Sequence, residues 1–437
     1  MPTGYTIEMV KQFLQPSTKM LGRVGSRFFL KMVFGLLVAK CVLLSEITRA
    51  LDEKISPKQT YKRLDHSLGR YDFRTLAEAQ ARRNCAQVGD EHVIALDGGD
   101  ISKPYAEHLE CLARVRDGSK NLVTNGYGLI SAVAVQPMGR DKNPLPLLLR
   151  PYSPAEEGFR SEPHELHEAI EDLHQWTGGR GIFAIDRAAD SKRVIRKLLW
   201  LSCRFVIRLK AGKGSRHLKV DGQPRLVSQL VDSAPLVGEA SLVRMADGKR
   251  RPFHCRFGSV RVQLDSPEED GFPLWLCVYH SNQHQQPMAL LTTEPADTDD
   301  QILFVLQCYW ARWSIEEYYR FVKQSYALEK VRYFKWARSK NLVHLVFIAT
   351  CLLAFLHRLP GRLAFRLQAS LIRHAKHVHR RHSRSSLVYF NLYAYAAGLA
   401  RILLASRPVL RRRGWFRLSL PPPARAAPRQ LSLPIPG

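Results

Sequence analysis

The chain has 437 residues, which excludes a single small module and leaves room for two or three domains. Its composition, 45% hydrophobic and 24% charged, is that of an ordinary globular protein and excludes a chain that lacks a core. The 66 Lys and Arg outnumber the 39 Asp and Glu, and the resulting net charge of +27 favours a polyanionic partner, with nucleic acid first.

The positive charge is concentrated toward the C-terminus. Glu329 is the last acidic residue, and the 108 residues that follow it carry 21 Lys and Arg. Basic groups that face phosphates gain affinity by releasing condensed counterions, so this region favours contact with a nucleic-acid backbone without reading of its sequence. The alternative is a basic tail that only keeps the protein soluble.

The eight cysteines are isolated and form no C-x-x-C pair, which argues against a zinc ribbon or a disulfide framework and favours a reducing compartment. The apolar run 28–44 is interrupted by Lys31 and Lys40 and lacks a following cleavage site, so it predicts a buried helix and not a signal peptide. A second apolar run, 345–356, is shorter than the roughly 20 residues that span a bilayer. We expect a cytoplasmic, nucleoid-associated protein that does not contact a membrane.

Residues 1–88 are expected to form a small helical domain. Ser56 and Pro57 fit the cap and the first position of a helix over 57–68. Basic side chains in this domain could contact DNA, although a solvated helix face explains the same charges. These side chains are Lys54, Lys58, Lys62, Arg63 and Arg70.

Residues 89–212 are predicted to form the first part of an α/β core. An apolar run from His92 ends in Asp97 and two glycines, which indicates a core strand, and the run 181–186 repeats this design with Asp186 at its end. Further strands are expected at 122–135, 145–149 and 204–209, and helices at 162–176 and 191–201. This order of elements predicts a mixed sheet.

The rest of the chain divides into four regions. Residues 213–293 form a β-rich insertion, 294–358 the second part of the core, 359–407 a basic helical region and 408–437 a disordered, basic, Pro-rich tail. Strands within the insertion are expected at 240–245, 253–264, 273–279 and 289–292. Helix returns at Asp300 and continues, with breaks, through Arg358, and one more helix is expected over 387–404.

A group of polar residues shares one helix face in the segment 309–323. At about 100° per residue, Tyr309, Arg312, Glu316 and Lys323 lie in one strip, and Arg320 falls within it. The basic groups would lower the pKa of the carboxyl, keep it ionised for a metal ion and reach phosphate themselves. The alternative is an ordinary surface helix with an Arg312–Glu316 pair at i,i+4. Apolar and aromatic neighbours argue for a buried helix instead, namely Trp310, Trp313, Ile315, Phe321 and Val322.

The spacing Tyr309-x2-Arg312-x3-Glu316-x6-Lys323 resembles the signature of DDE transposases of the insertion-sequence four family. The resemblance covers roughly residues 91–355 and implies an RNase H-like core with a β-rich insertion. It also implies that Asp97, Asp186 and Glu316 are the catalytic, metal-binding acids. Phosphate contacts are assigned to the basic and phenolic groups of the same strip, Tyr309, Arg312, Arg320 and Lys323.

For two of these three acids, another Asp nearby in the sequence is an alternative candidate for the catalytic position. Asp100 competes with Asp97, which we prefer because it directly continues the apolar strand. Asp190 competes with Asp186 but could instead cap the following helix. The segment that follows Asp186 departs from the family pattern, because Ala189 stands where members of the family usually have an aromatic residue.

The expected chemistry explains the need for three carboxylates. Hydrolysis of one phosphodiester and attack on another require an in-line nucleophile and a stabilised leaving oxygen, which two divalent ions about 4 Å apart can provide. Hard oxygen ligands suit Mg²⁺ or Mn²⁺. Asp97 would bridge both ions, and Asp186 and Glu316 would each hold one. Four histidines could form a different metal site, but we assign them to a basic DNA-facing helix: His374, His377, His379 and His382.

The expected function is therefore that of a DNA transposase of an insertion sequence, which binds terminal inverted repeats and catalyses metal-dependent strand cleavage and transfer. Residues 1–88 would bind the transposon ends, and 359–407 could support dimerisation. The resemblance implies a homodimer on double-stranded DNA, with transposon ends and target as its substrates. The alternatives are an RNase H-like nuclease that cuts without joining and a catalytically silent DNA-binding protein.

Overall fold

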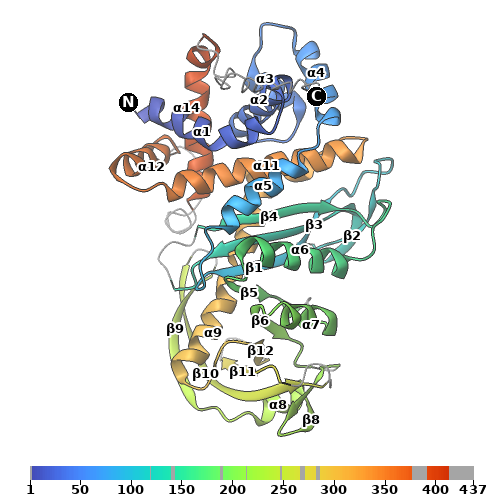
Figure 1. Cartoon of the computed structure of the whole chain (residues 1–437), viewed down its shortest axis with the longest axis vertical. Helices are drawn as coiled ribbons and strands as arrows, with labels where there is room; N and C mark the ends of the chain where they lie inside the picture. The colour runs from blue at the N-terminus through green and yellow to red at the C-terminus, as the bar shows by residue number, and fades with distance from the viewer. Residues whose placement is uncertain are drawn as a thin grey trace, which may run out of the picture.

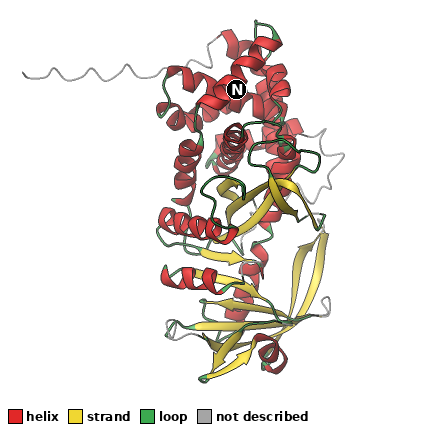
Figure 2. Ribbon diagram, turned by 90° about the vertical axis from the view of Figure 1, so that its right-hand side faces the viewer, coloured by secondary structure: helices red, strands yellow, loops and turns green. Residues whose placement is uncertain are grey.

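A computed structural model describes residues 2–118, 120–138, 143–187, 190–212, 214–246, 249–265, 271–281, 286–375 and 391–412. Helices gather at one end of the elongated molecule, and one large sheet runs through the rest of it (Figures 1 and 2). The N-terminal helices are α1 (Pro2–Lys19), α2 (Arg23–Ala39), α3 (Leu44–Leu51), α4 (Pro57–Arg70) and α5 (Arg74–Cys85).

The starts and ends of these helices follow local chemistry. Ser56 caps α4 through its Oγ, which accepts the N–H of Gln59, and Pro57 occupies the first turn, as predicted. The single helix predicted over 28–44 is wrong. Lys40 adopts a left-handed conformation with φ of 49° and ends α2, so Leu44 belongs to α3.

The sheet has twelve strands in the order β2-β3-β1-β5-β6-β12-β11-β10-β7-β8, with β4 also paired to β3 and β9 to β10. β5 is parallel to both β1 and β6, whereas β3 is antiparallel to β1 and β4. The order β4-β3-β1-β5-β6 is that of an RNase H-like core, so the predicted mixed α/β fold is confirmed. The strands of this core are β1 (Val93–Ser102), β2 (Ala113–Asp117), β3 (Leu122–Val135), β4 (Leu145–Tyr152), β5 (Ile182–Ile185) and β6 (Arg204–Leu209).

The first strand is longer than predicted. β1 continues past Asp97 through Gly98 and Gly99 to Ser102, and it pairs with β3 along its whole length. The two glycines carry no side chains that favour a strand, so the ladder from β3 determines this part of β1.

The β-rich region extends the core sheet. β12 pairs antiparallel with β6, and β11 and β10 continue from it. Its strands are β7 (His217–Val220), β8 (Gln223–Leu226), β9 (Gly238–Ala246), β10 (Lys249–Leu264), β11 (Leu274–Ser281) and β12 (Met288–Thr292), with helix α8 (Val227–Ser233) after β8. One hydrophobic cluster joins Phe257 and Tyr279 of this region to Ile302 and Val305 of the following helix, and to Ala184 of β5.

The remaining helices cover the sheet and join it to the N-terminal helices. They are α6 (Glu162–Thr177), α7 (Lys192–Trp200), α9 (Asp299–Ala311), α10 (Ser314–Ser325), the 3-10 helix η3 (Leu328–Lys330), α11 (Trp336–Arg358), α12 (Arg362–Ala375) and α14 (Leu392–Arg412). In Figure 1, α11 lies between the helical end and the sheet, against α5 and β4. Residues such as Leu342, Val346 and Leu353 are fully buried there, as predicted for this apolar run.

By length and composition, α11 is the one helix among the described residues that could cross a membrane, and 89% of its most apolar window is buried inside the protein. α2 and α3 would pass the same test only as a pair bent by 97°. At the C-terminal end, α14 includes Pro408 and so extends into the segment expected to be disordered. The rest of that tail, and His377, His379 and His382, lie outside the described residues. All eight cysteine thiols are described and free.

We predict that Asn341→Ala lowers the free energy of unfolding by about 3 kcal/mol, since it leaves buried backbone groups without partners. The buried Asn341 side chain in α11 accepts the N–H of Phe73 at 2.9 Å and donates to the carbonyl of Leu68 at 2.9 Å. Urea denaturation measures the change. The exposed Gln12→Ala in α1 is the control and should change little; equal effects would contradict this role for Asn341.

Candidate active site

Two of the predicted acids lie on neighbouring strands inside the sheet. β1 and β5 are parallel neighbours in which Ala95 pairs with Ala184. Asp97, in the middle of β1, and Asp186, the first residue after β5, each follow two residues after this pair, so their side chains are expected to leave the same face of the sheet at the same level. Adjacent strands are about 4.8 Å apart, which brings the two carboxylates into one neighbourhood.

The third acid comes from a helix that is shorter than predicted. The continuous helix expected over 309–323 is wrong, because α9 ends at Ala311 and α10 begins at Ser314. Arg312 and Trp313 between them keep right-handed helical dihedrals and tight-turn hydrogen bonds, such as Arg312 N–H to the Tyr309 carbonyl at 3.2 Å. The chain therefore stays compact, and Arg312 remains close to Glu316 despite the break.

Arg312 joins the sheet to α10. Its Nη2 lies 2.8 Å from Oε1 of Glu316, the i,i+4 pair named above for the alternative of a surface helix, and its Nη1 lies 3.7 Å from Oδ2 of Asp97. Its Cζ lies 5.7 Å from the centre of the Tyr309 ring. Arg312 is only 7% exposed. Trp313, predicted to be buried, is 44% exposed, so this turn presents one buried and one open side chain.

The pKa of Asp97 reports how close the acids are. Burial raises this pKa to about 7; the Arg312 charge opposes the rise, and the charges of Asp186 and Glu316 add to it. Three carboxylates that repel one another provide a donor set suited to a hard divalent cation. Among the described residues, however, no three His, Cys, Asp or Glu side chains are grouped closely enough to hold a metal ion, and Arg312 lies between Asp97 and Glu316.

Asp100 and Asp190, the alternative candidates for the two catalytic Asp residues, both have partners within the fold. Asp100 is buried, accepts the Ser102 hydroxyl at 2.6 Å and lies 3.4 Å from Nζ of Lys323. Asp190 accepts the N–H of Lys210 at 2.8 Å and pairs with Arg216 at 2.6 Å.

The alternative that Asp190 caps the next helix is wrong. Ser191 caps α7, because its Oγ accepts the N–H of Val194. The partners of Asp190 instead lie in the segment between β6 and β7, so this carboxylate connects that segment to the start of α7.

The four predicted DNA contacts differ in exposure. Tyr309 and Arg312 are buried, whereas the Arg320 side chain is 55% exposed and pairs with Glu317. Lys323 is partly exposed and lies between Asp100 and Glu329, with its Nζ 3.1 Å from a Glu329 oxygen. Direct phosphate contact is thus open to Arg320 and Lys323 in this arrangement, and the roles of all four remain predictions.

Tyr319 belongs to the site but was not among the predicted residues. Its hydroxyl donates to the backbone carbonyl of Asp97 at 3.0 Å, and its ring packs on Gly99, where an added Cβ would lie 2.7 Å from a ring carbon. Tyr319 thereby fixes the backbone that carries Asp97. The paired glycines after Asp97 were the available sequence signal, since glycine in a strand often marks close approach by another group.

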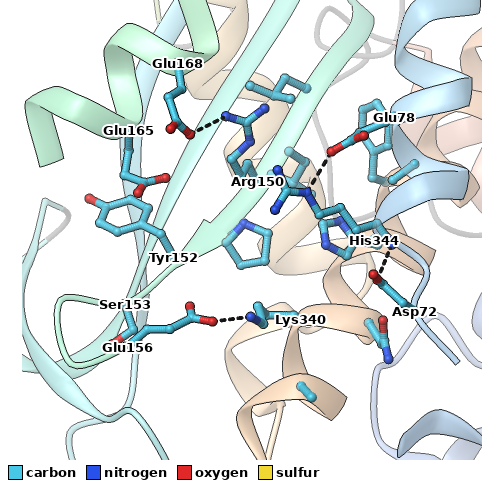
Figure 3. Close-up of a pocket in the computed structure, with 18 of the residues that line it drawn as sticks. Asp72, Glu78, Arg150, Tyr152, Ser153, Glu156, Glu165, Glu168, Lys340 and His344 are labelled. Atoms are coloured by element: carbon cyan, nitrogen blue, oxygen red, sulfur yellow. Dashed lines mark hydrogen bonds and ion pairs between the residues drawn. The ribbon is translucent and has the colours of Figure 1, made fainter. Parts of the chain in front are cut away.

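A cavity lies elsewhere in the molecule. It has a volume of about 690 Å³ and is bounded by α5, β4, α6 and α11 (Figure 3). Several of its charged side chains pair with one another, for example Arg150 with Glu168 at 3.8 Å and Lys340 with Glu156. None of the seven predicted site residues is among the described residues that line it. A smaller pocket of about 130 Å³ adjoins the Arg312 turn and is lined partly by Tyr309, Trp310 and Trp313.

Residues 158–352 match the family model of the transposase DDE domain. The matched span contains Asp186 and Glu316 and begins after Asp97, and it supports a DDE transposase. No curated protein matches the chain. Among solved structures, the piggyBac transposase synaptic complex with hairpin DNA is similar at 12% identity, with a TM-score of 0.43, over 95% of this chain and 84% of that chain.

We predict that Asp97→Asn stabilises the protein, measured without DNA or metal, and does so more at about pH 8 than at about pH 5. The pKa of Asp97 is raised from 3.8 to about 7, so the folded protein holds this proton more tightly and loses stability as pH rises between these values. The amide cannot ionise and escapes that loss.

Thermal melts at the two pH values test this prediction, with a rise of a few degrees expected at the higher one. Asp190→Asn is the control and should destabilise at both, because it weakens the ion pair with Arg216. A gain for Asp97→Asn that does not change with pH would contradict the raised pKa.

Proposed function

We propose that this protein is a DDE-type transposase of the insertion-sequence four family, which binds terminal inverted repeats and catalyses metal-dependent DNA cleavage and strand transfer. The observation that carries this proposal is that Asp97 of β1 lies beside Asp186, which follows the adjacent strand β5, and is linked through Arg312 to Glu316 of α10. The charges of Asp186 and Glu316 both raise the pKa of Asp97. The match of residues 158–352 to the transposase DDE domain supports the same reaction class.

The three acids would hold Mg²⁺ or Mn²⁺, with two ions per site. Bound there, such ions activate a water nucleophile and stabilise the leaving oxygen of a phosphodiester. The chain's own residues prepare this site: Tyr319 holds the Asp97 backbone through its carbonyl, and the turn at Arg312 sets the position of Glu316. Asp97 must also lose its proton, which its raised pKa delays to near neutral pH.

DNA is the proposed partner. The net charge of +27 and the basic C-terminal quarter provide backbone affinity, and Arg320 and Lys323 place two cations on the helix that carries Glu316. We assign residues 1–88 to binding of the transposon ends and propose that two copies act together on paired ends. A nucleoid-associated location in the cytoplasm would follow from these roles.

Glu316→Gln should reduce DNA cleavage by roughly 1000-fold or more, since it removes one proposed metal ligand. DNA affinity should stay equal or rise slightly, because the change removes a negative charge near phosphate. The assay incubates the purified full chain with Mg²⁺ and a duplex that carries the element's end, and it follows binding, nicking and joined product. Glu317→Gln, the adjacent acid that pairs with Arg320, is the matched control and should retain cleavage.

The wild-type products of this assay separate the three functions. Nicked and joined products support a transposase. Nicking without any joined product would identify a nuclease, and binding without metal-dependent cleavage would identify a silent DNA-binding protein. A large loss of binding in Glu316→Gln would contradict the assignment of Glu316 to catalysis.

Lys323→Ala should weaken binding to the end duplex and reduce the slope of log affinity against log salt by about one unit, as expected for one lost phosphate contact. Lys323→Arg keeps the charge and should keep the slope. Melting curves for both variants check that buried Asp100, which pairs with Lys323, tolerates the change. An unchanged affinity and slope in Lys323→Ala would exclude Lys323 from the DNA contact.

A further inference from the structure

Arg312 is held in an unusual place for a side chain that only contacts DNA. It is 7% exposed, lies at the junction of α9 and α10, and its Nε is buried without a hydrogen-bond partner among the described residues. A buried donor without an acceptor is costly, and a buried ion pair rarely gives net stability. This arrangement therefore calls for an explanation other than stability of the fold.

The position of the guanidinium supplies that explanation. Nη1 faces Asp97 at 3.7 Å and Nη2 faces Glu316 at 2.8 Å, so a single positive charge stands between two of the three proposed metal-binding carboxylates. A divalent cation held by the same carboxylates would lie within a few ångströms of this charge and be repelled by it. The guanidinium and the metal ion thus compete for the same negative charge.

The surroundings allow this competition to be resolved by movement of side chains. The Glu316 side chain is 47% exposed, so it can turn away from Arg312 without leaving a packed core. The centre of the Tyr309 ring, 5.7 Å from Cζ of Arg312, already gives the guanidinium a cation–π contact that does not depend on the carboxylates. Arginine also binds phosphate in a bidentate manner, so a DNA strand at this site would be a third partner.

We propose that Arg312 is the internal counter-ion of the metal-free site. It offsets the charges of Asp97 and Glu316 until divalent cations bind; its guanidinium then moves away from these carboxylates, keeps its contact with Tyr309 and binds a DNA phosphate. This inference rests on the proposed function, because it takes Asp97, Asp186 and Glu316 as the metal ligands. It goes further in making Arg312 a positioning residue that sets the affinity for metal before DNA arrives.

The test is Mn²⁺ binding to the purified full chain without DNA, measured by calorimetry and by the electron paramagnetic resonance of free Mn²⁺ in mildly alkaline buffer. Arg312→Met, which keeps the bulk and removes the charge, should bind Mn²⁺ about tenfold more tightly than wild type or better. Arg312→Lys keeps a charge but is too short to reach both carboxylates, so it should show a smaller gain. The matched control is Arg74→Met in α5, whose side chain forms an i,i+4 pair with Glu78 away from the proposed site and which should not alter Mn²⁺ affinity.

Melting temperatures with and without Mn²⁺ are the second measurement, and they show whether each variant is folded. Arg312→Met should melt at a lower temperature than wild type without metal, and Mn²⁺ should raise its melting temperature more than that of wild type. If Arg312→Met does not fold, Arg312→Lys alone decides the matter. Unchanged Mn²⁺ affinity in Arg312→Lys and in any folded Arg312→Met, or an equal gain in Arg74→Met, would overturn the proposal.

Mn²⁺ binding to the Glu316→Gln variant distinguishes failure of the counter-ion role from failure of the proposed function. If Glu316→Gln abolishes Mn²⁺ binding while the Arg312 variants bind like wild type, the acids hold metal and only the counter-ion role fails. If Glu316→Gln binds Mn²⁺ as wild type does, both alone and combined with Arg312→Met, then the metal does not bind at these acids and the proposed function fails with it.

Discussion

The parallel pairing of β1 with β5 is the constraint on which the candidate site depends. The register that aligns Ala95 with Ala184 places Asp97, in the middle of β1, beside Asp186, which directly follows β5. A shift of one residue would turn one of the two side chains to the opposite face of the sheet. The fully buried run from Val93 to Leu96 prevents such a shift, because it would expose apolar side chains or bury a carboxylate in the core.

The rest of the fold brings a third acid to this pair. Because β12 pairs with β6, the β-rich region continues the same sheet, and α9 packs on that continuation through Ile302 and Val305. The position of α10, and with it Glu316, is then fixed by the turn at Arg312. Two segments far apart in sequence are thereby joined by one rigid sheet and one ion-paired turn.

The sequence could predict those features that local pattern decides. β3 and β6 begin and end where the apolar runs predicted them, Ser56 capped its helix, and the Arg312–Glu316 pair followed from i,i+4 spacing. The second half of β1 could not be predicted, since glycines give no strand pattern and the pairing comes from β3. The break after Ala311 was also hidden, because Arg312 and Trp313 keep helical dihedrals. Tyr319 escaped prediction since only the tertiary fold brings it to Asp97.

The buried, like-charged carboxylates of the candidate site lower the stability of the fold. In a chain with net charge of +27, an Asp whose pKa is raised to about 7 is unexpected, because surrounding positive charge should lower that pKa. Burial and two neighbouring acids outweigh the distant charges, since solvent screens the latter over about 10 Å. A close positive charge is therefore needed to keep the acids together, and in the metal-free protein Arg312 supplies it. Under the proposed function, such a site would trade stability for the capacity to bind a cation, a compromise that is typical of functional sites.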